Sequence, residues 1–116
     1  MITKGIRGAI TVDDNNEEAI KCATVEVLTE MFKANNINKE LISHIIFTTT
    51  TDLNAAFPAK FARLNFGLTD TAMMCFHELD VPNSLPMCIR ILIVLNCKET
   101  FKPPFIYLKD AKNLRA

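Results

Sequence analysis

The stretch 88–96 (CIRILIVLN) constrains the fold more than any other part of the chain. It is apolar at nearly every position and shows little polar alternation. A strand with one solvated face alternates apolar and polar residues, whereas a strand covered on both faces does not. The stretch therefore predicts a central strand that is covered on both faces.

Two segments have the features of helices. Apolar side chains recur at helical spacing over 20–32, after Asp13 or Asp14 as a candidate N-cap. The second segment has Pro58 where a helix favours its first residue, and it stops at Gly67. We expect one long and one short helix.

The remaining segments predict strands. Residues 3–12 and 42–50 contain β-branched runs, and 71–79 fits a strand by its length and by the breaker that follows. Residues 105–109 make a last short strand, and the tail after them is too short to pack much. The order β, α, β, α, β, β, β is typical of an α+β domain with a mixed sheet and two main helices.

Composition argues against several classes of function. Thirteen basic residues balance thirteen acidic ones without a basic run, which disfavours binding to nucleic acid or to an anionic membrane surface. The first residues lack the apolar core of a signal peptide, and no apolar run approaches the length of a membrane span. We expect a cytoplasmic protein with a single domain over residues 1–116.

The four cysteines predict free thiols. Cys22, Cys75, Cys88 and Cys97 form no C-x-x-C pair, and each lies inside an apolar pattern. In a reducing compartment such residues are buried thiols more often than disulfides, and their spacing does not suit zinc. We therefore expect no metal.

Charged residues inside apolar strands are the candidate functional residues. Arg90 lies between Ile89 and Ile91, in the least polar segment of the chain, and an unpaired charge there is costly. Arg7 lies in the first strand, and Glu78 follows an apolar strand. By its position Arg90 fits a structural ion pair, with Glu78 as a candidate partner, and it fits equally an anion site that is filled when a ligand binds. Arg7 taken alone fits best an edge arginine in solvent. A strand-end carboxylate such as Glu78 is usually solvated, but its place after an apolar strand also fits a hydrogen-bonding role.

Other chemistries find little support. His44 and His77 have no serine nucleophile signature beside them, and there is no glycine-rich phosphate loop. What remains is a group of cations, one carboxylate, one phenol and apolar walls. Such a group can bind a small polyanion and act on it by electrostatics and positioning, without a cofactor.

Five motifs, in order from one end of the chain to the other, resemble the AroH-type monofunctional chorismate mutases. They are Gly5-Ile6-Arg7-Gly8-Ala9, Phe57-Pro58-Ala59-Lys60 with Arg63, Glu78-Leu79-Asp80-Val81, Cys88-Ile89-Arg90, and Tyr107-Leu108 with Leu114-Arg115. One such motif alone would mean little, but the ordered set is specific.

The resemblance implies a fold, an assembly and a reaction. It implies a homotrimer with a pseudo-α/β barrel at its centre, and active sites at the subunit interfaces that take residues from two chains. The implied reaction is the Claisen rearrangement of chorismate to prephenate, a step of aromatic amino acid biosynthesis that requires no cofactor and no metal.

The resemblance also implies roles for single residues. Arg90 would face the ether oxygen of the substrate, and Glu78 would accept a hydrogen bond from the ring hydroxyl. Arg7 and Tyr107 would bind carboxylate. The other expected substrate-binding residues are the apolar walls Phe57 and Leu114, the outer cations Lys60, Arg63 and Arg115, and the lining residues Ala59, Met73, Met74 and Cys75.

The sequence departs from the family pattern at one pair of residues, and two alternative functions have to be considered. The pair Met73-Met74 is bulkier and more apolar than the Val-Thr type of pair typical of the family, so we expect a different pocket lining. The first alternative is a trimeric small-molecule binding or deaminase-like protein on a related scaffold. The second is an interaction domain in which Arg7, Glu78 and Arg90 form structural ion pairs.

Overall fold

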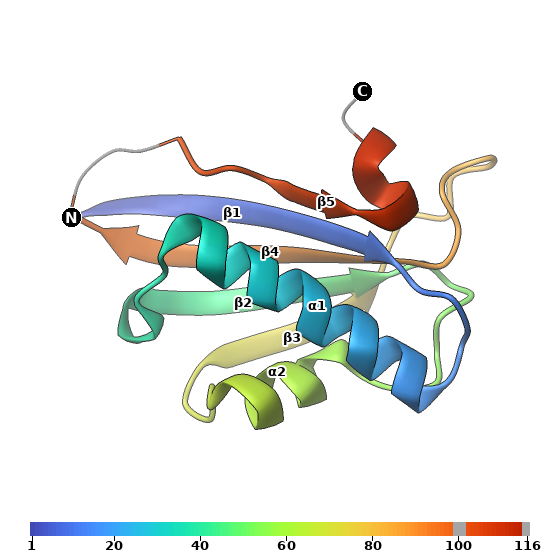
Figure 1. Ribbon diagram of the computed structural model, residues 1–116, viewed down its shortest axis with the longest axis horizontal. Coiled ribbons are helices and arrows are strands. Elements are labelled where there is room, and N and C mark those ends of the chain that lie inside the picture. Colours follow the sequence, from blue (N-terminus) through green and yellow to red (C-terminus); the bar gives the residue numbers. More distant parts are fainter. Residues whose placement is uncertain (99–101, 115–116) are drawn as a thin grey trace.

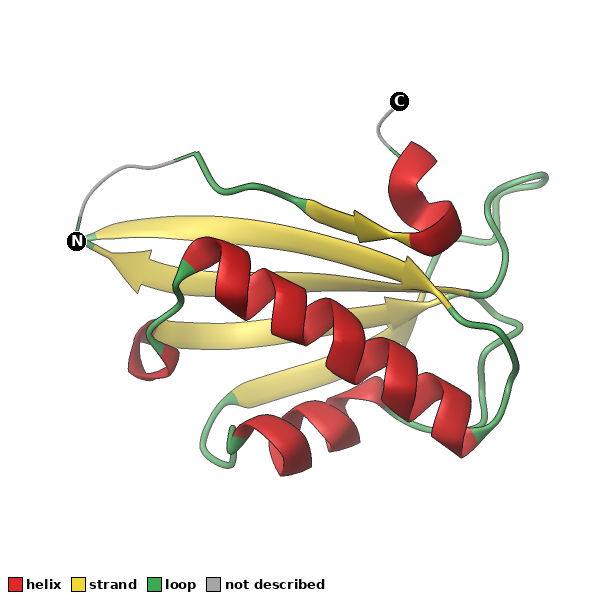
Figure 2. Cartoon of the chain, in the orientation of Figure 1, coloured by secondary structure: helices red, strands yellow, loops and turns green. Residues whose placement is uncertain are grey.

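A computed structural model describes residues 1–98 and 102–114 of the chain. Its strands and helices follow the predicted order, with two short 3-10 helices, η1 and η2, in addition (Figures 1 and 2). The elements are β1 (Ile2–Thr11), α1 (Glu17–Asn35), η1 (Lys39–Leu41), β2 (Ile42–Thr49), α2 (Pro58–Phe66), β3 (Ala72–His77), β4 (Cys88–Cys97), β5 (Ile106–Leu108) and η2 (Lys109–Asn113).

The five strands form one mixed sheet in the order β3-β2-β4-β1-β5. The middle strand, β4, pairs antiparallel with both β1 and β2. Its central position is the one that its apolar sequence predicted. The outer strands are parallel to their neighbours, β5 to β1 and β3 to β2. This arrangement confirms the predicted α+β fold with a mixed sheet and two main helices.

Both helices lie on the same face of the sheet (Figure 1). On that face the alternate residues of β4 from Ile89 to Leu95 are buried, with side chains of α1 such as Val27 and Leu28 packed against the sheet. Burying each such aliphatic side chain stabilises the fold by about 1.5–3 kcal/mol. This face therefore holds the main core.

The opposite face of β4 corrects the prediction of a strand covered on both sides. Arg90, Leu92 and Val94 are only half-buried, and no helix of the described residues covers them. This face is apolar as predicted, but the described residues do not cover it. The pattern of apolar residues predicts that a face is apolar, but it does not predict which element or molecule packs against that face.

The start of α1 also differs from the prediction. The N-cap is Asn16, whose side-chain oxygen accepts a hydrogen bond from the Ala19 amide at 2.8 Å. Asp14 instead accepts from the Asn15 amide at 2.9 Å, in the turn before the helix. Aspartate and asparagine cap helices about equally well, so the residue type alone did not distinguish these positions.

The short helix α2 matches its prediction. Pro58 is its first residue, and Gly67 ends it with a left-handed φ of 65°. The two helices contact each other through stacked rings of Phe32 and Phe66, whose centroids are 5.3 Å apart. No helix in the described part of the chain is long and apolar enough to span a membrane.

The C-terminal segment packs more than the sequence predicted. Ala111 of η2 is fully buried in a small cluster with Ala9 and Cys88, on the face of the sheet opposite the helices. The Asp110 amide donates to the Thr11 hydroxyl at 3.1 Å and fastens η2 to the end of β1. A short tail can thus pack when its small residues meet small residues on the sheet.

Gly8 allows α1 to approach β1 closely. A Cβ at position 8 would collide with Met31 Sδ and lie 3.0 Å from Met31 Cγ, and Met31 is fully buried. A methyl group at this position would therefore force a flexible but buried side chain to shift within the close-packed core.

We predict that Gly8→Ala lowers the free energy of unfolding by about 1–3 kcal/mol, because it overpacks this contact. Met31→Ala should cost about 2–5 kcal/mol through the cavity it leaves. Urea denaturation of both single variants and the double variant tests the contact. The double variant should lose less stability than the sum of the single losses. Strict additivity would show that the two positions do not collide.

Candidate active site

The predicted site residues Arg90 and Tyr107 lie on the face of the sheet that the helices leave open. The strand register pairs Ala9 with Arg90 on one side and with Tyr107 on the other. Thr48 pairs with Arg90 from the next strand. Because directly paired residues point to the same face, these side chains form one row across four strands.

Glu78 joins the row from the end of β3. Its amide donates to the Thr49 carbonyl at 2.8 Å, which continues the pairing of the two strands by one residue. The Glu78 carboxylate accepts from the Thr48 hydroxyl at 3.1 Å and lies 3.7 Å from Arg90 Nη1. Glu78 thus faces Arg90 without a close hydrogen bond to it.

Two polar atoms of this face are buried without a partner among the described residues. They are Arg90 Nε and the Tyr107 hydroxyl. A buried donor without a partner costs about 1–3 kcal/mol, and native proteins rarely tolerate it without a reason. Both atoms belong to residues that the sequence assigned to ligand binding, so a bound polar ligand is the simplest reason.

A hollow of about 350 Å³ lies beside this row. Its walls combine two cations and one carboxylate with apolar side chains, a mixture that suits a small anion with an apolar ring. The lining residues are Arg7, Ile46, Thr48, Glu78, Arg90, Ile91 and Leu92. We call Arg7, Glu78, Arg90 and Tyr107 the open-face group.

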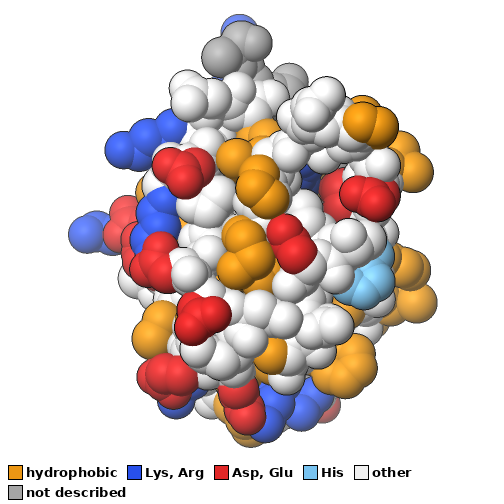
Figure 3. Space-filling view, turned by 90° about the vertical axis from the view of Figure 1, so that its right-hand side faces the viewer, with side chains coloured by type: hydrophobic (Ala, Val, Ile, Leu, Met, Phe, Trp, Pro, Cys, Tyr) orange, Lys and Arg blue, Asp and Glu red, His pale blue; other side chains and the backbone are white. Residues whose placement is uncertain are grey.

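The surroundings of this group are apolar. In Figure 3 charged side chains gather on the left, on the helix side of the molecule, and hydrophobic ones on the right, on the side of the open face. Met74 and Phe76 of β3 are 61% and 46% exposed there, and Ile46, Leu92 and Val94 continue the surface across the sheet. An exposed apolar surface of this kind marks an interface or a binding site.

Cys88 lies on the same face as Arg90 but remains a neutral thiol. Burial raises the pKa of the Cys88 thiol, and the nearby charge of Arg90 opposes that rise without cancelling it. The neutral thiol leaves the charge of Arg90 uncompensated from this side. The positive charge is then available to an anion.

The other predicted binding residues lie elsewhere. A second hollow of about 500 Å³ opens between the start of α1, the loop before α2 and the end of β3. Phe57, Lys60 and Cys75 line it, and Ala59 packs at the border of the main core. Burial raises the pKa of the Cys75 thiol. We call Phe57, Ala59, Lys60 and Cys75 the helix-side group.

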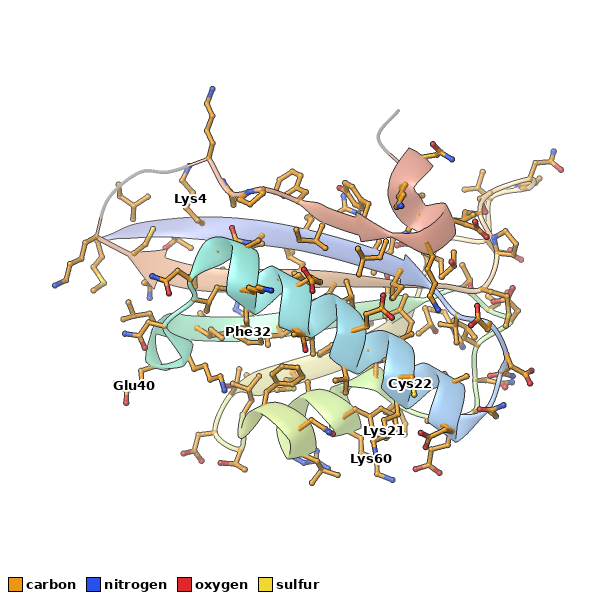
Figure 4. The ribbon with its side chains drawn as sticks, in the orientation of Figure 1. Lys4, Lys21, Cys22, Phe32, Glu40 and Lys60 are labelled. Atoms are coloured by element: carbon orange, nitrogen blue, oxygen red, sulfur yellow. The ribbon has the colours of Figure 1, made fainter. Side chains whose placement is uncertain are left out.

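Lys60 is already paired within the chain. Its ammonium group lies 2.9 Å from the Glu17 carboxylate at the first turn of α1. Figure 4 shows Lys60 among the side chains of the two helices, close to Lys21 and Cys22 in that view. Both partners are about half exposed, so the pair holds Lys60 only loosely.

The chain does not bring the two groups together. No residue lines both hollows, and strand parity directs Cys75 and Met73 to the helix side while Met74 faces the open side. Arg63 is exposed on α2, and Leu114 packs beside Tyr107 in the small cluster with Ala111. Arg115 lies outside the described residues.

Two residues that support these groups were not predicted from the sequence. Thr48 holds the Glu78 carboxylate, and its alternation with Ile46 along β2 was the only signal. Asn15 holds the loop that leads to Phe57: its side-chain oxygen accepts from the Asn54 and Ala55 amides at 3.1 Å, and its amide group donates to Asn54 Oδ1 at 2.8 Å. Contacts between residues so distant in sequence leave no local pattern.

Within the described residues, no cluster of three or more potential metal ligands occurs.

Comparisons with known proteins agree on one family. Residues 3–116 match the family described as chorismate mutase type I. The chorismate mutase AroH of Thermus thermophilus is 41% identical over 116 residues, covering 98% of this chain and 94% of that protein. The AroH of Bacillus subtilis is 35% identical over 95 residues, covering 82% and 75%. A solved chorismate mutase structure from Clostridium thermocellum superposes with a TM-score of 0.89 at 46% identity, covering 94% of this chain and 97% of that one.

The loose contact between Arg90 and Glu78 predicts little loss of stability when it is removed. Arg90→Ala and Glu78→Gln should each lower the free energy of unfolding by no more than about 1 kcal/mol, because both side chains keep access to solvent. Urea denaturation measures this, with Lys60→Ala as a control that breaks another ion pair. A loss of about 3–5 kcal/mol in Arg90→Ala would identify a structural ion pair instead.

Proposed function

The chain belongs to the chorismate mutase type I family, and on that premise we propose that the open-face group carries the chemistry of its active site. The protein is a chorismate mutase, an isomerase that converts chorismate to prephenate in aromatic amino acid biosynthesis. The question that remains is how the side chains of this chain accelerate that reaction.

The reaction makes specific demands on the protein. Chorismate is a dianion with an enolpyruvyl ether, and its rearrangement breaks one C–O bond while one C–C bond forms. No proton transfer and no covalent intermediate is required. The protein has to hold a compact conformer and to stabilise the negative charge that develops on the ether oxygen.

Arg90 is the residue that we assign to the ether oxygen. The observation that carries this assignment is its buried, unpartnered Nε beside a carboxylate that is 3.7 Å from Nη1. A guanidinium held in this way binds more strongly as the oxygen becomes negative, which lowers the barrier rather than the substrate affinity. One such contact contributes about 3 kcal/mol of the roughly 8 kcal/mol that a million-fold acceleration requires.

The other open-face residues hold the substrate. Arg7 lines the same hollow, and its planar fork suits a carboxylate of the dianion. Tyr107 has a buried hydroxyl without a partner in the described chain and can donate to carboxylate. Glu78 accepts from the Thr48 hydroxyl and from the Leu79 amide, and its remaining lone pairs can accept a further hydrogen bond from the ring hydroxyl of chorismate. Leu114 adds an apolar wall beside Tyr107.

We propose that the active site is completed by a second copy of the chain in a homotrimer. Two observations support this: the sheet has an apolar face that the described residues leave exposed, and the two hollows have no lining residue in common. Arg7, Glu78 and Arg90 line one of them, and Phe57, Lys60 and Cys75 line the other. In a closed threefold assembly each copy gives its open-face group to one site and its helix-side group to the next. The open faces would then line a barrel-like centre.

The helix-side group has a supporting role in this proposal. Phe57 is 71% exposed in the single chain and would form an apolar wall for the substrate of the neighbouring copy. Lys60 and Arg63 would attract the dianion, together with Arg115 of the tail. The site would be lined by Ala59, Met73, Met74 and Cys75, the last through its backbone because its side chain points into the helix side.

We further propose that the protein works in the cytoplasm. All four cysteines lie within the described residues and are free thiols. Free thiols are typical of a reducing compartment, where disulfides do not persist.

The first prediction from this proposal concerns activity. Wild type should consume chorismate, followed by its ultraviolet absorbance, without added metal or cofactor. Arg90→Ala should lower kcat/KM at least about a hundred-fold while remaining folded. Arg90→Lys keeps the charge but loses the fork, so its activity should lie between the two. A wild type no faster than buffer would exclude the proposed chemistry for this chain.

The second prediction concerns the shared site. Arg90→Ala removes the open-face half, and Lys60→Glu places a negative charge in the helix-side half. When equal amounts of the two inactive variants are unfolded together and refolded, about a quarter of all sites should combine two intact halves, because mixed trimers each hold one. Activity should therefore return to about a quarter of the wild-type value. If refolded mixtures of correct size stay inactive, each site belongs to one chain.

A further inference from the structure

Met87, the residue directly before β4, has an unfavourable backbone conformation. Its φ of 53° lies in the left-handed region, where the Cβ of an ordinary side chain is crowded. Asn83 in the same loop is also left-handed, but asparagine tolerates this region well. A strained methionine three residues before Arg90 needs something to hold it there.

Asp52 supplies that hold. The Met87 amide lies 3.0 Å and 3.2 Å from the two carboxylate oxygens of Asp52. The Thr50 hydroxyl donates to Asp52 and accepts from the Cys88 amide at 3.0 Å. The Thr50 amide in turn donates to the Cys88 carbonyl at 3.0 Å. The first residue of β4 is thereby fixed to the segment that follows β2.

A second contact holds Met87 from the other side. The Val12 amide donates to the Met87 carbonyl at 2.7 Å, just past the end of β1. The loop before it gives little support of its own, since residues 79–84 are all exposed. Nearer the strand, Met87 packs against the main core and Leu85 against the small cluster with Cys88. This apolar packing does not set the left-handed φ of Met87, so we attribute that turn to the hydrogen bonds of Met87 and Cys88.

We propose that Asp52 is a positioning residue for Arg90, acting through the left-handed turn at Met87. The inference rests on the proposed role of Arg90 at the ether oxygen. With the carboxylate in place, Met87 keeps its turn, β4 keeps its starting point, and Arg90 stays aimed into the hollow. A shift of about 1 Å in such a group can cost up to a hundred-fold in rate.

The kinetic test compares Asp52→Ala, Asp52→Asn, Met87→Gly and the double variant Asp52→Ala/Met87→Gly. Asp52→Ala should lower kcat about ten-fold and change KM by less than about two-fold, because the Arg90 contact strengthens in the transition state. Asp52→Asn keeps an acceptor oxygen and should retain more activity. Asp70→Ala removes another exposed acidic side chain, away from this turn, and should leave kcat unchanged.

The double variant separates positioning from a general loss of structure. Glycine adopts the left-handed turn without strain but removes the packing of the Met87 side chain on the main core. Met87→Gly should therefore be less stable than wild type but keep its kcat, and it should restore most of the activity lost in Asp52→Ala. Amide hydrogen exchange gives a second readout: Met87 and Cys88 should exchange faster in Asp52→Ala than in wild type.

Three results would overturn the inference. They are an Asp52→Ala variant with wild-type kcat, an unchanged exchange of the Met87 and Cys88 amides in that variant, and a double variant as slow as Asp52→Ala. Failure of the proposed function would appear elsewhere, as an Arg90→Ala variant that keeps wild-type kcat in the same assay.

Discussion

The two α-helices of this protein, α1 and α2, lie on the same face of its sheet, and the rest of the structure depends on that asymmetry. On the covered face the side chains of β4 from Ile89 to Leu95 alternate into a closed core. On the other face the same strand presents Arg90 between apolar neighbours that stay half-buried. A fully sealed second face would impose the whole desolvation penalty on the guanidinium, whereas an open one lets a ligand or a second subunit complete its surroundings.

Arg90 is held between two requirements that oppose each other. A charge inside an apolar strand needs a partner for the protein to remain stable, but a fully satisfied charge has little left to offer a substrate. The separation of 3.7 Å from Glu78, and the occupation of that carboxylate by Thr48, leave the pair incomplete. The structure thus leaves a cation without a close partner. Under the proposed function its best partner would be the developing oxyanion, and little reorganisation would be needed at the moment of reaction.

Polar side chains in loops locate the strand ends at the site. Asp52 and Thr50 hold the start of β4, Thr11 holds the segment after β5, and Asn15 holds the loop before α2. These loops are largely exposed, so apolar packing cannot determine their shape. Directional hydrogen bonds do so instead, and they transmit loop geometry to the residues that follow. The apolar core stabilises the sheet, whereas these hydrogen bonds determine the conformation of the loops at its end.

The sequence by itself determined the order of the elements, because hydrophobic periodicity, Pro58 and Gly67 act over a few residues. It also identified the open-face group, since a charge at Arg90 within an apolar strand is visible without coordinates, and ordered motifs resemble one family. Tertiary structure decided the rest: that Asn16 rather than Asp13 or Asp14 caps α1, that η2 packs on the sheet, and that the described residues leave one face of β4 open. It also separated the helix-side residues from the open-face group. Those outcomes depend on contacts between residues far apart in the chain, which local patterns do not encode.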